Sequence, residues 1–264
     1  MLGGCVAIPT RVKTMRDYDG VSEAELAARL GIPRVVALDE TESTLDVAHQ
    51  LAEQGAAAGT LIVADTQRSG RGRMGRAWTS MPGQGVWSTL IERVADPRAL
   101  DVLSIRVGLA LAELLDAIAG EHVRLKWPND LLISGGKLGG ILCETRWAGQ
   151  TPSWVAVGVG VNVVAPQGIE GAAGLPPGAA RLDVLAAIVR AVRLAAGHRY
   201  ATGHLHPDEL AKFAARDALA GARIASPSAG VAAGIDATGA LIVQTVHGVE
   251  SHRTGTVVLA EDKS

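Results

Sequence analysis

The sequence lacks the features that mark secreted, membrane-spanning or nucleic-acid-binding proteins. Its 264 residues include only two cysteines, Cys5 and Cys143, which build no disulfide framework and fit a reducing compartment. Charged residues interrupt the apolar runs well short of the ~18 residues that a membrane span needs. The formal net charge is only −2, so no globally basic surface is available for nucleic acid. We therefore expect a cytoplasmic protein that binds neither membranes nor nucleic acid.

The chain is rich enough in apolar residues, at 48%, for one sizeable core with a small appendage. Residues 1–20 show no periodicity, and we expect them to form a flexible leader. Helical spacing of apolar residues predicts helices over 22–30, 43–54, 98–119, 181–201 and 207–219. Apolar and β-branched runs predict strands over 34–38, 60–66, 86–94, 123–126, 130–134, 138–146 and 153–163.

These elements indicate two domains after the leader. Residues 21–219 are expected to form the main domain, an α+β fold in which helices cover one face of a mixed sheet. After Gly221 the pattern changes to five short runs of strand type, separated by tight turns. Residues 220–264 are therefore expected to form a small C-terminal β-barrel that docks on the main domain.

A loop rich in glycine and arginine follows the strand expected over 60–66. Three glycines within residues 70–75 allow the backbone to turn sharply and to approach a ligand closely. Four guanidinium groups lie within nine residues, on Arg68, Arg71, Arg73 and Arg76. Such a cluster repels itself unless an anion lies among its members, and guanidinium groups bind phosphate or carboxylate in a bidentate manner. The loop is thus a candidate anion-binding site.

Other interpretations of this loop are a disordered basic segment or a patch that binds nucleic acid. The apolar flanks and the absence of a wider basic surface argue against nucleic acid. The loop is not a Walker A motif, because it lacks the Gly-Lys-Ser/Thr ending. It is not a Rossmann turn either, because basic residues stand where small ones are needed.

Four segments, taken in order, resemble the motifs of the biotin–protein ligase family. Gly70–Trp78 resembles its Gly-Arg-Gly-Arg-x-Gly-Arg-x-Trp loop. Lys126–Asp130, Lys137–Glu144 and Val157–Val163 resemble its second, third and fourth motifs. The similarity covers about residues 34–260, and four motifs in family order are far more specific than one.

The resemblance implies a class II synthetase-like biotin ligase fold with an SH3-like C-terminal barrel. It also implies that the protein activates biotin with ATP and transfers the biotinyl group to a lysine. By resemblance, that lysine belongs to the biotin carboxyl carrier protein domain of an acyl-CoA carboxylase. The family includes monomers and homodimers. The stretch before residue 34 is short for a winged helix-turn-helix and holds one expected helix, so we expect a single-function ligase without a DNA-binding domain.

The resemblance further implies a set of residues around biotin: Ser43, Thr44, Gln67, Arg71, Gly72, Arg73 and Lys137. Biotin presents a ureido group, an apolar bicycle and a carboxylate. Hydroxyl and N–H groups of Ser43 and Thr44 suit the ureido group, although both residues could instead simply cap the following helix. The sequence departs from the family pattern at Leu45, where the family usually has Asn. Either another group supplies the missing hydrogen bonds, or affinity is weaker, or the ligand differs.

A nucleotide site is implied by the same resemblance: Arg71, Arg73, Arg76, Trp78, Asn129 and Asn162. The biotin carboxylate must attack the α-phosphate of ATP, and the two anions repel each other. We therefore expect Arg73, Lys126 and Lys137 to be catalytic, because they neutralise this repulsion. Trp78 is expected to stack on adenine, with core packing as the alternative.

Three polar features of the expected site leave alternatives open. Mg²⁺ is expected to bridge the phosphates, and Asp130 is a candidate to approach it unless this residue only caps its turn. Asn162 lines the pocket or satisfies the backbone of a turn. No nucleophilic Ser or Cys is needed, because the acceptor lysine attacks the adenylate directly.

Two other functions compete with this interpretation. A lipoate–protein ligase or octanoyltransferase would have the same fold, and Leu45 favours it slightly because lipoyl has no ureido group. A non-catalytic biotin sensor or a degenerate binding module is the other possibility. The complete set of Arg and Lys residues argues against a degenerate module.

Overall fold

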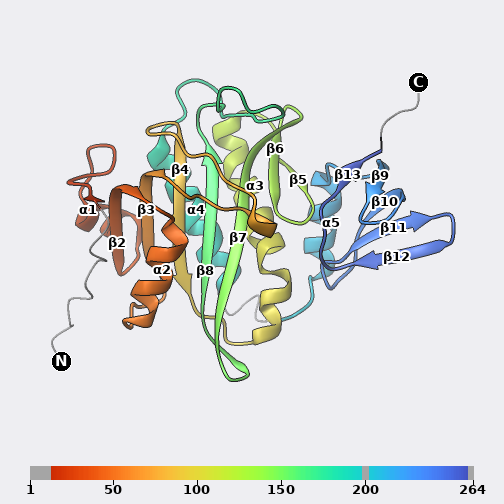
Figure 1. The fold of residues 1–264 in the computed structure, drawn as a ribbon, viewed down its shortest axis with the longest axis horizontal. Helices are drawn as coiled ribbons and strands as arrows, with labels where there is room; N and C mark the ends of the chain where they lie inside the picture. The colour runs from red at the N-terminus through yellow and green to blue at the C-terminus, as the bar shows by residue number, and fades with distance from the viewer. Residues whose placement is uncertain (1–12, 198–201, 261–264) are drawn as a thin grey trace.

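The computed structural model describes residues 13–197 and 202–260, and its centre is an eight-stranded mixed sheet (Figure 1). The strands follow each other across the sheet in the order β1-β2-β3-β4-β8-β7-β6-β5. Their bounds are β1 Lys13–Thr14, β2 Arg34–Thr41, β3 Thr60–Gln67, β4 Gly85–Glu92, β5 Arg124–Lys126, β6 Asp130–Ile133, β7 Gly136–Ala148 and β8 Thr151–Asn162. Among these described strands, only β2 and β3 pair in parallel, so the expected α+β class and mixed sheet are confirmed.

The helices begin and end close to the residues that the sequence indicates. They are α1 Glu23–Leu30, α2 Thr44–Glu53, α3 Leu103–Ala119, α4 Arg181–Ala196 and α5 Pro207–Arg216, with short 3-10 helices at Arg73–Gly75 and Pro97–Val102. The Ser22 side chain caps α1 by accepting from the Glu25 amide, and Gly31 ends it in the left-handed region. The helix expected over 98–119 starts with the 3-10 turns at Pro97–Val102, and α3 itself begins at Leu103. The end of the helix expected over 181–201 lies partly outside the described residues.

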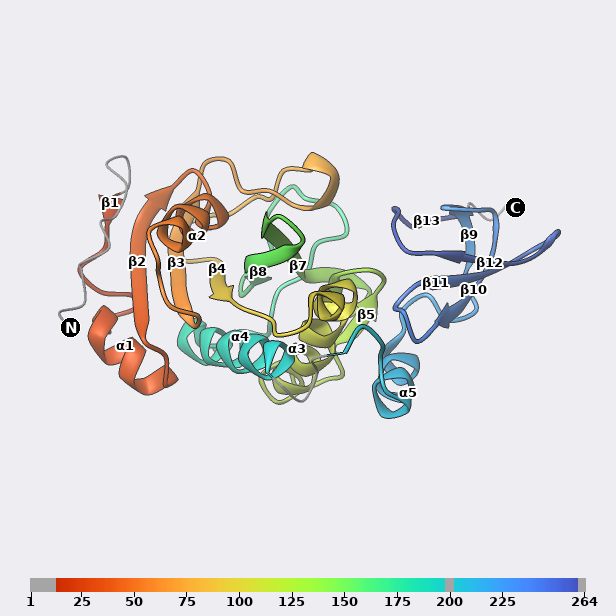
Figure 2. The ribbon, with the colours of Figure 1, turned by 90° about the horizontal axis from the view of Figure 1, so that it is seen from below.

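The helices do not all cover one face of the sheet, and this corrects the sequence-based expectation. The larger core packs α1, α3 and α4 against one face of the sheet. A second core of buried residues packs α2 against the other face, with Leu38 and Ile62 among its members. Figure 2 shows α2 on one side of the strands and α1, α3 and α4 on the other. Consequently α2 stands beside the glycine and arginine loop.

A second, smaller sheet lies at the C-terminal end of the chain. It is antiparallel, with strand order β12-β11-β10-β9-β13. The strands are β9 Arg223–Ser226, β10 Gly230–Ile235, β11 Leu241–Thr245, β12 Gly248–His252 and β13 Val258–Leu259. This arrangement is compatible with the expected SH3-like domain. The Trp127 indole N–H joins it to the main sheet by donating to the Gly239 carbonyl over 2.9 Å.

Residues 13–20 do not form the flexible leader that the sequence predicts. The strand β1 pairs with β2, and Tyr18 is fully buried. The Arg181 guanidinium lies 4.4 Å from the centre of the Tyr18 ring, and burial raises the pKa of the tyrosine to about 12. Residues 1–12 lie outside the described part of the chain. Among the described residues, no helix has both the length and the apolar character needed to cross a membrane.

Candidate active site

A single cavity brings together the segments that the sequence marked for chemistry. It lies on the face of the sheet that carries α2, and the C-terminal sheet contributes one edge. Its wall is formed by Ser43, Thr44, Leu45, Gln67, Arg71, Gly72, Arg73, Met74, Arg76, Ala77, Trp78, Trp87, Ser88, Lys126, Trp127, Pro128, Asn129, Asp130, Lys137, Gly140, Ile141, Leu142, Gly158, Val159, Gly160, Gly255, Thr256 and Val257. Every residue expected at the site lies in this wall, with the exception of Asn162.

The start of α2 forms the uncharged end of the cavity. Ser43 is the N-cap of this helix, and its hydroxyl accepts from the Leu45 amide over 3.3 Å. The backbone N–H and the hydroxyl of Thr44 both donate to the side-chain oxygen of Gln67, over 2.9 and 3.1 Å. The carbonyl of Gln67 is therefore already used, and its NH₂ group is the part left to bind a ligand. Helix capping and ligand binding are thus compatible roles for Ser43 and Thr44.

Leu45 presents an apolar surface where the family usually has an amide. Its side chain is buried and belongs to the core under α2. A Cβ on Gly158 would lie 3.3 Å from both Leu45 methyl groups, so the leucine fills the space above this glycine. This wall favours the apolar part of a ligand and supplies no hydrogen bond.

The loop at residues 70–78 forms a narrow hairpin. The Trp78 amide donates to the Gly70 carbonyl over 2.7 Å, and the Gly72 amide donates to the Arg76 carbonyl over 2.7 Å. A Cβ on Gly70 would lie 2.5 Å from the Trp78 carbonyl oxygen, which explains why this position requires glycine. The tip is Arg73–Gly75, a 3-10 turn in which Met74 adopts a left-handed conformation with φ of 55°. The sharp backbone turn that the glycines predict is therefore present in the loop.

Arg71 is already paired with carboxylates. Its Nε and one terminal nitrogen donate to the two oxygens of Glu144, over 2.9 and 3.1 Å, and the same terminal nitrogen lies 2.8 Å from Asp46. The hydrogen bond from Arg71 holds the pKa of the Glu144 carboxyl below its ordinary value. Arg71 lines the cavity, but its charge is compensated by these neighbours.

The remaining cations differ in their partners. The Lys137 ammonium lies 2.7 Å from an oxygen of Asp130. Within residues 13–197 and 202–260, Arg73, Arg76 and Lys126 form no ion pair. The cavity therefore holds a surplus of positive charge next to an uncharged end, which suits a ligand that carries anionic groups at one side only.

Trp78 lies at the floor of the cavity. A Cβ on Gly160 would lie 2.8 Å from its ring, and one on Gly140 would lie 3.4 Å away, so the indole rests on two bare stretches of backbone. The Lys137 ammonium is 5.3 Å from the ring centroid. The indole N–H of Trp78 is buried and lacks a partner among the described residues. The ring therefore packs on the sheet and also lines the cavity.

The two asparagines expected to contact nucleotide donate their side-chain N–H groups to backbone carbonyls. The Asn129 amide donates to the Ile141 carbonyl over 2.9 Å, although this residue still lines the cavity. The Asn162 amide donates to the carbonyls of Lys137 and Ala173, over 3.2 and 3.0 Å. Asn162 does not line the cavity, so its expected direct contact with nucleotide is not supported here. The structure favours the alternative, in which Asn162 satisfies backbone groups and thereby holds Lys137.

Sequence reasoning missed three contributors to the site. Glu144 binds Arg71, and its place at the end of the third motif was the only sequence feature that could have indicated a role at the site. Trp87 lines the cavity because side chains along β4 point to alternate faces of the sheet, and nothing in the sequence marks this residue. Thr256 accepts from the Arg76 guanidinium over 3.0 Å, and a short C-terminal segment offers no sequence pattern for such a contact.

The fold is that of the biotin protein ligases. Biotin protein ligase from Aquifex aeolicus in complex with biotin and ATP superimposes with a TM-score of 0.70 at 23% identity, covering 86% of this chain and 99% of that one. A biotin acetyl coenzyme A carboxylase synthetase from Helicobacter pylori, with bound biotinylated ATP, gives a TM-score of 0.61 at 19% identity over 83% and 99% of the two chains. At these identities the likeness shows the fold alone.

The sequence comparisons point in the same direction as the fold. The model of the biotin/lipoate A/B protein ligase family matches residues 37–162 of this chain. A bifunctional ligase/repressor BirA of Bacillus subtilis is 42% identical over 47% of this chain and 39% of its own length. A biotin–[acetyl-CoA-carboxylase] ligase of Mycobacterium tuberculosis is 32% identical over 61% of each chain. The matched region thus spans about half the length of these curated relatives.

Proposed function

We propose that this protein is a biotin–protein ligase. It activates biotin with ATP to form biotinyl-5'-AMP and transfers the biotinyl group to a lysine of a carrier protein. The observation that carries this proposal is the cavity, in which an uncharged, partly apolar end adjoins cations from the 70–78 loop and the 126–137 segment. A molecule with a neutral polar head and a distant carboxylate matches the first part, and a nucleotide triphosphate matches the second.

Biotin is proposed to bind at the α2 end. The residues assigned to it are those expected from the sequence: Ser43, Thr44, Gln67, Arg71, Gly72, Arg73 and Lys137. The Ser43 hydroxyl and the Gln67 NH₂ group supply polar contacts for the ureido group. Leu45 faces the apolar bicycle. Because Arg71 is held by Glu144 and Asp46, its backbone and that of Gly72 are better placed to serve biotin than its guanidinium.

The first step joins two anions. A biotin carboxylate oxygen attacks the α-phosphorus of ATP, the bond to the bridging oxygen of the β-phosphate breaks, and pyrophosphate leaves with the electron pair. Arg73, Lys126 and Lys137 neutralise the approach and the charge that builds on phosphorus. Arg76 adds a fourth positive charge near the phosphates. The Asn162 amide contributes by holding the backbone of Lys137.

The nucleotide is proposed to lie over Trp78, whose ring can stack on adenine, with Asn129 beside it. Mg²⁺ would be held mainly by the phosphates. The cavity offers it one carboxylate, Asp130, which is already paired with Lys137. No group of three or more potential metal ligands occurs among the described residues. These donors fit an ion that arrives with the triphosphate and keeps most of its waters, and its chemistry there is to neutralise phosphate charge.

The second step needs no nucleophile from this chain. The neutral amine of the acceptor lysine attacks the biotinyl carbonyl carbon, the carbon–oxygen bond to phosphate breaks, AMP leaves, and the amine loses a proton to solvent. Lys137 steadies the oxyanion that forms in between. We propose a biotin carboxyl carrier protein domain as the acceptor, because two curated relatives are described as biotin–[acetyl-CoA-carboxylase] ligases.

The test is pyrophosphate release by the purified protein with ATP and Mg²⁺, comparing biotin, lipoate and octanoate. We expect release to depend on biotin and to be negligible with the other two acids. Release with lipoate or octanoate alone would instead identify the lipoate-type activity, which the apolar Leu45 wall favours. No release with any of the three would support a binding protein without catalysis.

A further inference from the structure

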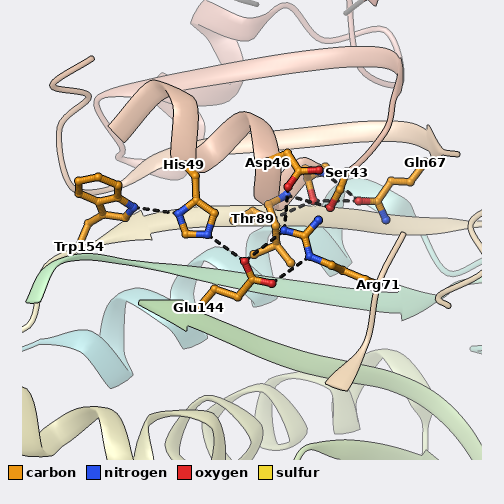
Figure 3. Close-up of polar contacts among 10 residues, drawn as sticks. Ser43, Asp46, His49, Gln67, Arg71, Thr89, Glu144 and Trp154 are labelled. Carbon is orange, nitrogen blue, oxygen red and sulfur yellow. Dashed lines mark hydrogen bonds and ion pairs between the residues drawn. The ribbon is translucent and has the colours of Figure 1, made fainter. Parts of the chain in front are cut away.

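Beyond the cavity wall, a chain of polar contacts leads from Arg71 into the protein interior (Figure 3). Glu144 binds Arg71 through both carboxylate oxygens, and one of these oxygens also lies 2.9 Å from Nε2 of His49. Nδ1 of the same ring lies 3.0 Å from the indole nitrogen of Trp154. Three separate segments therefore meet at one carboxylate: the 70–78 loop, α2 and β7.

The hydrogen-bond pattern fixes the protonation of the histidine ring. An indole nitrogen can only donate, so Nδ1 of His49 must be the acceptor in its bond with Trp154. The hydrogen of the neutral ring is then on Nε2, which donates to Glu144. His49 is 5% exposed, so its ring is largely shielded from solvent. Its ring is a fixed, oriented donor toward the carboxylate.

The arrangement of charge explains why a donor is useful here. Two carboxylates, Glu144 and Asp46, share the single guanidinium of Arg71. This set carries one excess negative charge, and the Nε2–H of His49 stabilises it with a charge-assisted hydrogen bond. Without that bond, the Glu144 carboxylate would be held on one side only and could rotate away from Arg71.

Arg71 stands at the base of the loop that covers the cavity. It forms a β-bridge with Ala77, so both ends of the loop meet at this residue. Arg76 contacts Thr256, between β12 and β13, whereas among the loop arginines and the residues that the structure describes only Arg71 forms ion pairs with α2 and β7. Fixing Arg71 therefore fixes where the loop leaves the sheet.

We propose that His49 is a positioning residue that acts through Glu144 and Arg71 to hold the base of the arginine loop in the conformation that binds biotin. The part of its test that measures enzyme activity rests on the proposed function. His49 lies outside the four motifs and does not line the cavity. Trp154 is the second part of the device, because its N–H holds the ring in the donating tautomer.

The test compares His49→Leu, which keeps the volume and removes both nitrogens, with His49→Gln, which retains a donor and an acceptor. Each is made in the wild-type and in the Arg71→Ala protein. We expect His49→Leu to raise the KM for biotin roughly tenfold, and His49→Gln to stay within about threefold of wild type. In the Arg71→Ala background His49→Leu should have no further effect, because the link it supports is gone. His247→Leu, at an exposed histidine between β11 and β12, is the matched control.

A second readout needs no enzyme activity. Trypsin cleavage within residues 71–76 of the ligand-free protein, mapped by mass spectrometry, reports how often the loop opens. His49→Leu should speed this cleavage, and again only when Arg71 is present. If His49→Leu does not fold, Trp154→Phe decides, because it keeps an aromatic side chain but removes the N–H that orients the His49 ring, and it should shift both readouts in the same direction.

Additive effects of His49→Leu and Arg71→Ala, or a His49→Leu protein with unchanged loop cleavage and unchanged biotin KM, would overturn the proposal. Failure of the proposed function is seen separately, as a wild-type protein without biotin-dependent pyrophosphate release. In that event the cleavage readout still decides whether His49 holds the loop.

Discussion

The five cations of the cavity wall fall into two groups at the scale of single residues. Arg71 and Lys137 face carboxylates of Glu144 and Asp130, so each has a fixed position and a compensated charge. Arg73, Arg76 and Lys126 have no carboxylate partner in the described part of the chain. A site that must hold two anions needs both kinds, since fixed cations set the geometry and unpaired cations supply net charge.

Replacing Arg73 with glycine is predicted to affect retention of the intermediate more than its formation. The variant should still make the adenylate, but release it at least tenfold faster, because a charge-assisted hydrogen bond to the phosphate is lost, worth about 1.5–3 kcal/mol. The measurement is the half-life of protein-bound adenylate after gel filtration. Arg68→Gly is the control, since Arg68 pairs with Glu40 outside the cavity. Equal half-lives for Arg73→Gly and wild type would refute the prediction.

The family resemblance predicted most of the side chains that line the cavity, but not how they pair. The motifs place Arg71, Lys137 and Trp78 in one cavity, as expected. The partners of Arg71 could not be predicted, because Glu144 is 73 positions away in sequence and a carboxylate at the end of a strand has many possible neighbours. The backbone contacts of Asn162 were equally hidden, since they depend on where residue 173 returns to the sheet.

At the scale of elements, glycines in β7 and β8 make the floor of the cavity. Gly140 and Gly160 pair with each other across the two strands, and the Trp78 indole lies over both. A Cβ at Gly160 would lie 2.8 Å from the ring and so displace it, whereas one at Gly140 would lie 3.4 Å away, in contact with its edge. The third and fourth motifs therefore act together, although they are separate in sequence.

Gly160→Ala is predicted to displace the Trp78 indole, because the added Cβ would lie 2.8 Å from the ring. Overpacking of this kind costs about 1–3 kcal/mol, so the KM for ATP should rise roughly tenfold while the KM for biotin changes less. Gly158→Ala is the comparison, since it adds the same methyl group to the same strand against Leu45. A KM for ATP in Gly160→Ala equal to that of wild type would contradict this role for Trp78.

The helices and strands were largely predictable, but the side of the sheet on which a helix packs was not. The apolar spacing of α2 predicts one buried face, and this face is the same whichever side of the sheet it covers. The two cores show that α2 packs opposite to α3 and α4. Pairing of β1 with β2 was missed for a different reason, because a two-residue strand shows no periodicity.

At the scale of the whole molecule, the cavity depends on both sheets. Gly255, Thr256 and Val257, between β12 and β13, form one edge of its wall. Trp127, inside the second motif, hydrogen-bonds the Gly239 carbonyl of the small sheet. The small sheet was predictable from its short strands and turns. Its contact with the arginine loop was not, because it joins residues 180 positions apart.

We propose that this one cavity joins a vitamin carboxylate to the α-phosphate of ATP. The most direct measurement is mass spectrometry of the products after the purified protein is mixed with biotin, ATP and Mg²⁺ in the absence of any acceptor protein. We expect biotinyl-5'-AMP, bound to the protein in about one equivalent per active site, together with pyrophosphate. A protein that binds both substrates and yields no mixed anhydride would contradict it.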